Sequence, residues 1–251
     1  LLPFPWGGEL EAPSAAYFDE DASVIVDQTG SRLLFLDEDE RLVRMQTLSS
    51  ASQIDFISGV TRQDGSFYIW GNKMVKDSGY TKYDQILRCS ADGSELETVY
   101  RADRTQRDAE RCLILDVDTD GRYLWITEIL NDPHNIWDCG LTVLKADMKH
   151  PEQAPETVFR RESIWVCSAG YLPESGTLYV SNNFGELYRF CGDELLDTAY
   201  AKPHYVKNVL PVDEETLVWC ESDTRDLYCN DRVLLEQTNA YNNLSVDRGG
   251  F

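Results

Sequence analysis

The sequence has few basic side chains for its size. Its 251 residues include 23 Lys and Arg against 44 Asp and Glu, which gives a formal net charge of −21. Nucleic-acid binding of the usual kind needs clustered Lys and Arg to contact phosphates, and docking on anionic lipid needs the same positive charge. The composition therefore excludes nucleic acid as a partner, and we expect membrane contact only through a segment outside this chain.

Long apolar runs and low-complexity segments are also lacking. Hydrophobic residues make up 42% of the chain, but no apolar run approaches the ~20 residues of a transmembrane helix. Gly and Pro number only 16 and 9, too few for low-complexity disorder. A chain of this length can bury roughly 70–75% of its unfolded surface. We therefore expect a globular domain with a sizeable core.

Helical periodicity and catalytic motifs are missing as well. No stretch keeps a 3.6-residue apolar period beyond a turn or two, which predicts little helix. No Gly-x-Ser-x-Gly elbow, Gly-rich phosphate loop or His-Glu-x-x-His motif occurs. The sequence thus leans away from an enzyme, and it predicts no cofactor.

What the sequence does contain is a repeated turn followed by a compact apolar strand. The copies are anchored at Gly30, Gly65, Gly121, Gly176, Glu215 and, at its start only, Gly249. These anchors are 35, 56, 55, 39 and 34 residues apart, which brackets the period of a four-stranded propeller blade. The strands are apolar on both sides, so we expect neighbouring blades to cover both of their faces.

Each anchored strand has other candidate strands around it. In the third copy an apolar segment at 112–115 precedes it, a segment with a basic end follows at 143–145, and a more polar segment follows at 156–159. Four strands per unit joined by Gly and Asp turns is typical of a blade. The sequence therefore predicts an all-β β-propeller of six blades with up to four antiparallel strands each, of which the last can be incomplete.

Copies such as residues 64–70 (Asp-Gly-Ser-Phe-Tyr-Ile-Trp) resemble the blades of the NHL/TolB-like six-bladed propellers. The resemblance covers roughly residues 20–251, and such families include sensors, scaffolds, hydrolases and lyases. Residues 12–17 are similar to the start of extracytoplasmic propellers from Gram-positive gut bacteria. The resemblance implies a propeller outside the membrane, joined to a membrane helix or a signalling module.

The two ends of the chain predict how the domain is bounded. The apolar residues 1–6 are typical of the rim of a preceding membrane helix or signal segment, or of an arm that packs on the domain. We expect residues 1–20 to form an N-terminal arm or a strand that closes the last blade, and residues 21–251 to form the propeller. Because the sixth copy is only begun, we expect the natural protein to continue beyond Phe251.

The seven cysteines favour packing over a disulfide framework. Their number is odd, the chain is large, and no CxxC or zinc-ligand spacing occurs. A bridge between Cys220 and Cys229, which could face each other across a hairpin, stays open.

Two patterns raise the question of a metal, although none is predicted. Residues 116–121 (Asp-Val-Asp-Thr-Asp-Gly) are similar to the opening of a calcium loop, but the closing carboxylate is misplaced and a hairpin turn is the favoured interpretation. Propeller lactonases hold a metal in the central tunnel with side chains from inner strand ends. Glu128, Asn182 and Glu221 lie just beyond second strands, so a metal-dependent hydrolase or lyase is the alternative function.

The expected recognition surface is the insertion at residues 131–138 in the third repeat. Asn131, His134 and Trp137 suit binding of a sugar, peptide or partner protein when a rigid scaffold carries them. The alternative is an ordinary loop whose Trp packs on a neighbouring blade. Residues 182–185 (Asn-Asn-Phe-Gly) are expected to form a hairpin turn.

Taken with the resemblance, the sequence favours a non-enzymatic, extracytoplasmic sensing or interaction domain. We expect it to be anchored to the cell membrane by a segment not present here, and to bind a small ligand, a glycan or a protein partner.

Overall fold

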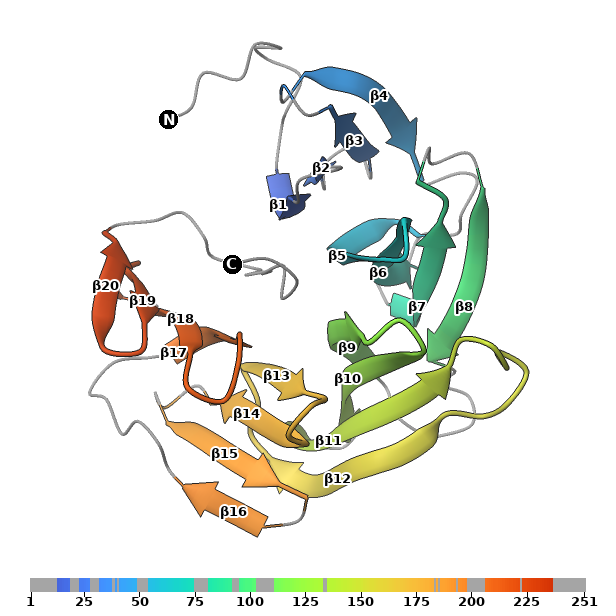
Figure 1. Cartoon of the computed structure of the whole chain (residues 1–251). Coiled ribbons are helices and arrows are strands. Elements are labelled where there is room, and N and C mark those ends of the chain that lie inside the picture. The colour runs from blue at the N-terminus through green and yellow to red at the C-terminus, as the bar shows by residue number, and fades with distance from the viewer. Residues whose placement is uncertain are drawn as a thin grey trace. The chain divides into compact units, whose positions relative to one another are not determined.

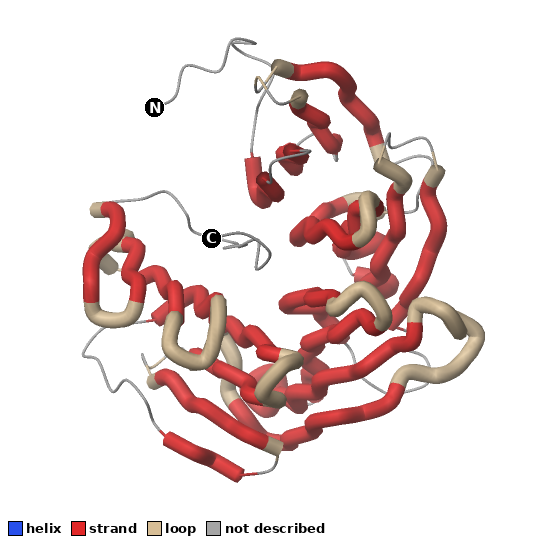
Figure 2. The backbone as a smooth tube through the Cα atoms, viewed as in Figure 1, coloured by secondary structure: helices blue, strands red, loops and turns tan. Residues whose placement is uncertain are grey.

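The fold consists of β-strands joined by turns and loops (Figure 2). The computed structural model describes residues 13–18, 23–27, 32–37, 39, 41–48, 54–74, 81–91, 95–102, 111–132, 135–182, 184, 186–192, 194–197, 206–221 and 223–236. The chain divides into two compact units, of which the first contains β1 to β8 and the second contains β9 to β20 (Figure 1). Among the described residues, no helix has the length and hydropathy needed to span a membrane.

The first unit contains two four-stranded antiparallel sheets, each with its strands in chain order. The first sheet consists of β1 (Pro13–Phe18), β2 (Ser23–Asp27), β3 (Arg32–Leu36) and β4 (Leu42–Thr47). The second sheet consists of β5 (Phe56–Gln63), β6 (Ser66–Met74), β7 (Thr81–Cys89) and β8 (Leu96–Ala102). The two sheets share one apolar core, in which the Phe67 ring meets Tyr17 and Phe35 edge-on at 6.1 and 5.6 Å between centroids.

The second unit contains three more sheets of the same kind. The third sheet consists of β9 (Arg111–Thr119), β10 (Tyr123–Asp132), β11 (Asn135–Asp147) and β12 (Glu156–Ile164). The fourth consists of β13 (Ser168–Leu172), β14 (Thr177–Ser181), β15 (Leu187–Cys191) and β16 (Glu194–Asp197). The fifth consists of β17 (Val206–Pro211), β18 (Leu217–Glu221), β19 (Leu227–Cys229) and β20 (Arg232–Leu235). One core joins the third and fourth sheets and another joins the fourth and fifth.

Burial along the strands follows their place in each sheet. Every residue of β2 and of β14, the second strands of their sheets, is buried. The outer strand β4 instead alternates between half-buried and exposed residues, and β20 is exposed throughout. A strand that is apolar on both sides must be covered on both faces, as the repeats predicted, whereas an outer strand needs to bury only one face.

Left-handed glycines mark the first hairpin of three sheets. Gly65, Gly121 and Gly176 have φ of +74°, +83° and +69° at the β5–β6, β9–β10 and β13–β14 turns. Glycine adopts this conformation without a steric penalty, so a one-residue turn signal recurs in the sequence. These anchors were placed correctly.

The anchor at Gly30 marks the wrong turn of its sheet, because the other described anchors precede the second strand and Gly30 precedes the third. Gly30 lies between the second and third strands of its sheet, and β2 occupies the position that β6 or β10 occupies in its own sheet. The strand before it is β1, which pairs with β2 through Tyr17 and Val24. Residues 13–18 of the expected N-terminal segment therefore form β1, the first strand of the first sheet. The error arose because residues 19–22, between β1 and β2, contain no Gly.

The described residues form five four-stranded sheets, where the sequence predicted six. The predicted sixth copy begins at Gly249, which lies outside the described residues. The difference in count therefore comes from that last copy, since each of the other five anchors lies beside a described sheet.

Candidate functional site

The predicted recognition insertion at residues 131–138 is mostly strand. Asn131 belongs to β10 and pairs with Cys139, while Trp137 belongs to β11. The expected loop is thus the tip of a long β10–β11 hairpin. His134, and the side chains of Asn131 and Trp137, lie outside the described residues, so this prediction stays a prediction.

The Asp-rich segment at residues 116–121 forms a hairpin and does not wrap a loop. Asp116 and Asp118 lie within β9. The Asp120 carboxylate accepts hydrogen bonds from the backbone N–H groups of Arg122 and Tyr123 at 2.9 and 2.7 Å. The favoured interpretation, a turn between two strands, is therefore confirmed.

The three residues of the tunnel alternative were expected just beyond second strands, but only Asn182 follows its strand; Glu221 is the last residue of β18 and Glu128 lies in the middle of β10. Glu128 in β10, Asn182 after β14 and Glu221 in β18 are 0%, 4% and 1% exposed. Glu221 accepts a hydrogen bond from the Thr224 hydroxyl at 2.6 Å. Within the part of the chain that the structure describes, no group of three or more His, Cys, Asp and Glu side chains is placed to hold a metal ion.

The six described cysteines are all free thiols. Cys220 lies opposite Leu227 and Cys229 lies opposite Val218, so the two are not cross-strand partners. The question of a Cys220–Cys229 bridge, left open by the sequence, is answered in the negative.

A groove of about 340 Å³ lies in the second unit, between the outer strand β12 of the third sheet and the fourth sheet. We call it the β12–β15 groove. It is lined by Arg161, Ser163, Ile164, Trp165, Asn182, Phe184, Glu186, Tyr188, Phe190 and Leu195. The Phe159 ring of β12 packs on the Phe190 ring of β15 with centroids 5.7 Å apart, which holds the two walls together.

An exposed aromatic pair stands in this groove. Trp165 directly follows β12 and Phe184 lies in the β14–β15 turn; they are 38% and 63% exposed. Their ring centroids are 4.9 Å apart with an interplanar angle of 30°. Ser163, two residues before Trp165, has φ of +57°, which is rare for a residue other than glycine. Because the two exposed rings are in contact, they form one apolar patch, which is more informative than a single exposed aromatic.

Asn182 fixes the turn that carries Phe184. Its side-chain oxygen accepts the backbone N–H groups of Phe184 and Glu186 at 2.9 and 3.0 Å, and its amide donates to Glu186 Oε2 at 2.6 Å. The predicted turn at residues 182–185 is therefore confirmed, and Asn182 acts as its cap.

Glu186 and Tyr188 form a hydrogen-bonded pair on the groove wall. The Tyr188 hydroxyl donates a short hydrogen bond to Glu186 Oε2. This bond, and then the Asn182 amide, lower the pKa of Glu186. Burial first, and then the hydrogen bond to Glu186, raise the pKa of Tyr188 to about 12. At neutral pH the groove thus presents an ionised carboxylate beside a neutral phenol.

Arg161 supplies a positive charge to the same groove. Its guanidinium carbon lies 4.8 Å from the centroid of the Phe190 ring, a cation–π geometry. Phe190 is itself buried, and its ring centroid lies 6.2 Å from that of Tyr188 with an interplanar angle of 28°. The groove therefore combines an aromatic pair, one anion and one cation on rigid strands.

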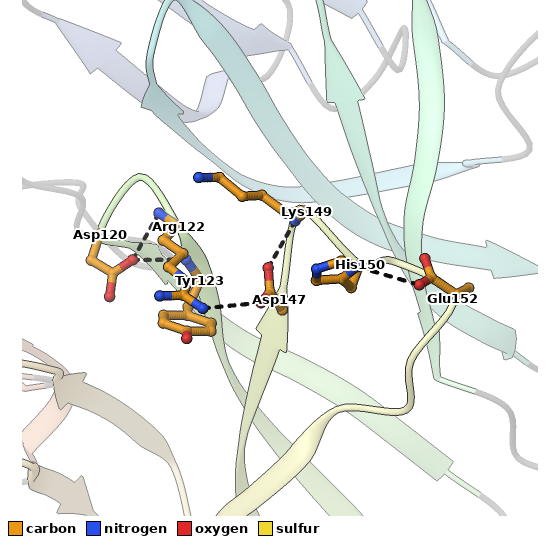
Figure 3. Close-up of polar contacts among 7 residues, drawn as sticks. All are labelled: Asp120, Arg122, Tyr123, Asp147, Lys149, His150 and Glu152. Atoms are coloured by element: carbon orange, nitrogen blue, oxygen red, sulfur yellow. Dashed lines mark hydrogen bonds and ion pairs between the residues drawn. The ribbon is translucent and has the colours of Figure 1, made fainter.

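A second polar cluster lies at the opposite end of β12, around the β9–β10 and β11–β12 turns (Figure 3). Asp147 accepts the Lys149 N–H at 2.9 Å and pairs with Arg122 at 3.6 Å. The Lys149 N–H is the main cause of the lowered pKa of Asp147. Arg122 also lies over the Tyr123 ring at 4.7 Å. Because its groups bond to one another across the two turns, this cluster is explained by turn stability.

The comparisons with known proteins identify the fold. No model of a known protein family matches the sequence, and no curated protein matches it. Among solved structures, a propeller chain from the crystal structure of a nidogen/laminin complex is similar to this chain with a TM-score of 0.58 and 10% sequence identity, covering 89% of this chain and 79% of that one.

The chain is a β-propeller. Its five described sheets are antiparallel four-stranded blades, and the groove lies between the third and fourth blades. A likeness at 10% identity shows the fold alone. Any function must therefore be inferred from the groove residues themselves.

The sequence interpretation missed the groove. Residues 164–167 (Ile-Trp-Val-Cys) read as a continuous apolar segment, but β12 ends at Ile164 and β13 begins at Ser168, which places Trp165 in a connection. The Phe in the Asn-Asn-Phe-Gly turn was the one available signal, because a large aromatic at a turn tip has little core to pack against.

Proposed function

We propose that this β-propeller is a non-enzymatic binding module, the extracytoplasmic sensing or interaction domain of a larger membrane-tethered protein. The observation that carries the proposal is the exposed Trp165–Phe184 pair beside an ionised carboxylate in the β12–β15 groove. Such grooves, largely apolar with a few oriented polar groups, are typical ligand sites.

The composition of the groove supports a protein or peptide ligand. Trp, Tyr and Arg are enriched among the side chains that dominate binding energy at protein interfaces, and the groove contains one of each. The similar propeller comes from a nidogen/laminin complex, which is an assembly of proteins. That support is analogy of fold only.

The location rests on the family resemblance. The Asp-Gly-x-aromatic copies support membership of the six-bladed NHL/TolB-like group, and the group's extracytoplasmic members support a place outside the membrane. We expect the full-length protein in intact cells to be digested by added protease. A protein that survives until the cells are lysed would contradict this part of the proposal.

The groove is tested by comparing three variants over one panel of glycans and peptides. The double variant Trp165→Ala/Phe184→Ala should lose at least tenfold in affinity for every ligand that the wild type binds. Phe56→Ala removes an equally exposed aromatic from the first unit and should change nothing. Trp137→Ala tests the hairpin tip with Asn131 and His134, which we retain as a proposed second contact.

The assay has two informative failures. Loss of binding only in Trp137→Ala would move the site to the hairpin tip. Full binding by all three variants would reject both surfaces. Urea unfolding midpoints, measured for each variant, separate loss of binding from loss of folding.

A metal-dependent hydrolase or lyase is the second candidate. It is favoured by the burial of two carboxylates, Glu128 and Glu221, and of the Asn182 amide, in or directly after the second strands of three successive sheets. Metal analysis of the purified protein decides between the two. One tightly held divalent ion per chain, lost in Glu128→Gln, would establish this candidate over the binding module.

A further inference from the structure

We infer that the β12–β15 groove binds an extended basic peptide of a partner protein, with one Arg or Lys side chain placed against Trp165 and Phe184 and paired with Glu186. This inference rests on the proposed function and names the ligand class of the same site. It follows from the charge of the groove, the geometry of its rings and the exposure of its aromatic and carboxylate side chains.

The carboxylate of Glu186 is positioned before any ligand arrives. The Tyr188 hydroxyl and the Asn182 amide both donate to its Oε2 atom. The side chain is exposed, so Oε1 can accept from a ligand without breaking these bonds. A carboxylate held in place loses little conformational entropy on binding, and charge-assisted hydrogen bonds are the strong ones.

The aromatic pair provides the matching surface for a cation. The negative face of a Trp ring is the best side-chain partner for a guanidinium or ammonium group. Arg161, stacked at 4.8 Å on Phe190, shows that this groove already accommodates a guanidinium on a ring. Trp165 and Phe184 are more exposed than Phe190, so a ligand can reach their rings.

Arg161 itself favours a peptide over a free cation. A lone ammonium ion would be repelled by this second positive charge, whereas an extended peptide offers backbone carbonyls that can accept from the guanidinium. The net charge of −21 attracts a basic partner from a distance and raises the rate of encounter. The partly exposed Leu195 adds an apolar contact for a neighbouring side chain.

A glycan fits the groove less well. Stacking of a sugar requires an open ring face with hydrogen-bonding groups around it. Here Trp165 and Phe184 cover one face of each other, and the Asn182 side chain is already used by the turn. A glycan is therefore the competing outcome in the test.

The test uses fluorescence polarisation with labelled heptapeptides that carry one central Arg flanked by Leu and Ser. Citrulline, the neutral isostere of Arg, replaces it in the paired probe. We expect the wild type to bind the Arg peptide at least tenfold more tightly than the citrulline peptide. Glu186→Gln should remove that difference, and Glu152→Gln, which removes an exposed carboxylate at the far end of β12, should preserve it.

Two results would overturn the inference. Equal affinity for the Arg and citrulline peptides, or no peptide binding at all, would show that the groove does not select a cation. If a glycan or a neutral ligand then bound and was lost in Trp165→Ala/Phe184→Ala, the proposed binding function would survive without this ligand class. If that variant bound everything as the wild type does, both would fail.

Discussion

Asn182 both caps the β14–β15 turn of the fourth blade and orients the carboxylate of Glu186 in the groove. Its three side-chain hydrogen bonds hold the backbone at Phe184 and Glu186 and orient the Glu186 carboxylate. Because Asn182 is buried, a residue that cannot accept these bonds leaves two N–H groups without their partner. One residue therefore affects both stability and the site.

We expect Asn182→Ala to lower the free energy of unfolding by about 1–3 kcal/mol, the usual cost of unsatisfied buried donors. Asn182→Asp keeps both acceptor contacts but sets a second carboxylate beside Glu186, so it should also raise the pKa of Glu186. Urea unfolding checks the first effect and carboxyl NMR the second. An Asn182→Ala variant as stable as the wild type would show that the turn does not need its cap.

The Glu186–Tyr188 hydrogen bond sets a pH window for the groove. The pKa of Glu186 is lowered in the fold, so the stability that its charged form contributes is present above its ordinary value of 4.5 and is lost as the pH falls through the folded value. The pKa of Tyr188 is raised to about 12, so its contribution is present below 10.0 and is lost as the pH approaches 12. Between pH 4.5 and pH 10.0, Glu186 stays ionised and Tyr188 stays protonated, so the hydrogen bond between them is kept.

Tyr188→Phe tests this pair directly. The variant removes the main cause of the lowered pKa, so we expect the pKa of Glu186 to rise toward 4.5 in an NMR titration. As the pH is lowered, the variant should therefore lose affinity for the Arg peptide at a higher pH than the wild type does. An unchanged Glu186 titration would mean that the Asn182 amide alone sets its pKa.

At the scale of elements, the second blade shows how closely neighbouring strands approach. β5 pairs with β6 in antiparallel fashion, and the pairing shifts register between Ile57 and Gly59. A Cβ added at Gly71 of β6 would lie 2.0 Å from the backbone oxygen of Phe56. A backbone atom cannot rotate away, so the two strands could keep this spacing only with glycine at position 71.

We expect Gly71→Ala to cost about 3 kcal/mol, at the upper end for an overpacked site. The matched change Gly65→Ala meets no atom within 4 Å, but the left-handed φ of +74° should cost a residue with a Cβ about 1 kcal/mol. Thermal unfolding of both variants provides the comparison. Equal costs would indicate that β5 can move away from β6.

At the scale of the whole molecule, the charge of −21 is the dominant electrostatic feature. Like charges repel within a folded chain, and salt screens this repulsion over about 10 Å at 0.1 M. We expect Tm to rise between low salt and 0.15 M NaCl by about 2–4 °C, which corresponds to roughly 1 kcal/mol in a protein of this size. An uncharged osmolyte at equal osmolality is the control, and an equal rise in that control would reject the electrostatic cause.

The sequence alone predicted the all-β fold and the four-stranded blade, because strand periodicity and turn chemistry are local properties. Gly65, Gly121 and Gly176 mark hairpins that each span only a few residues. The same locality explains the error in the first blade, where the β1–β2 connection has no glycine and the turn at Gly30 was the more visible one.

Only the tertiary structure decided where the groove lies. Arg161 and Trp165 come from the end of the third blade, whereas Phe184, Glu186 and Tyr188 come from the middle of the fourth. Neither group has a spacing typical of a binding motif. They form a site because packing of Phe159 on Phe190 brings β12 against β15, and that contact depends on two blades folding together.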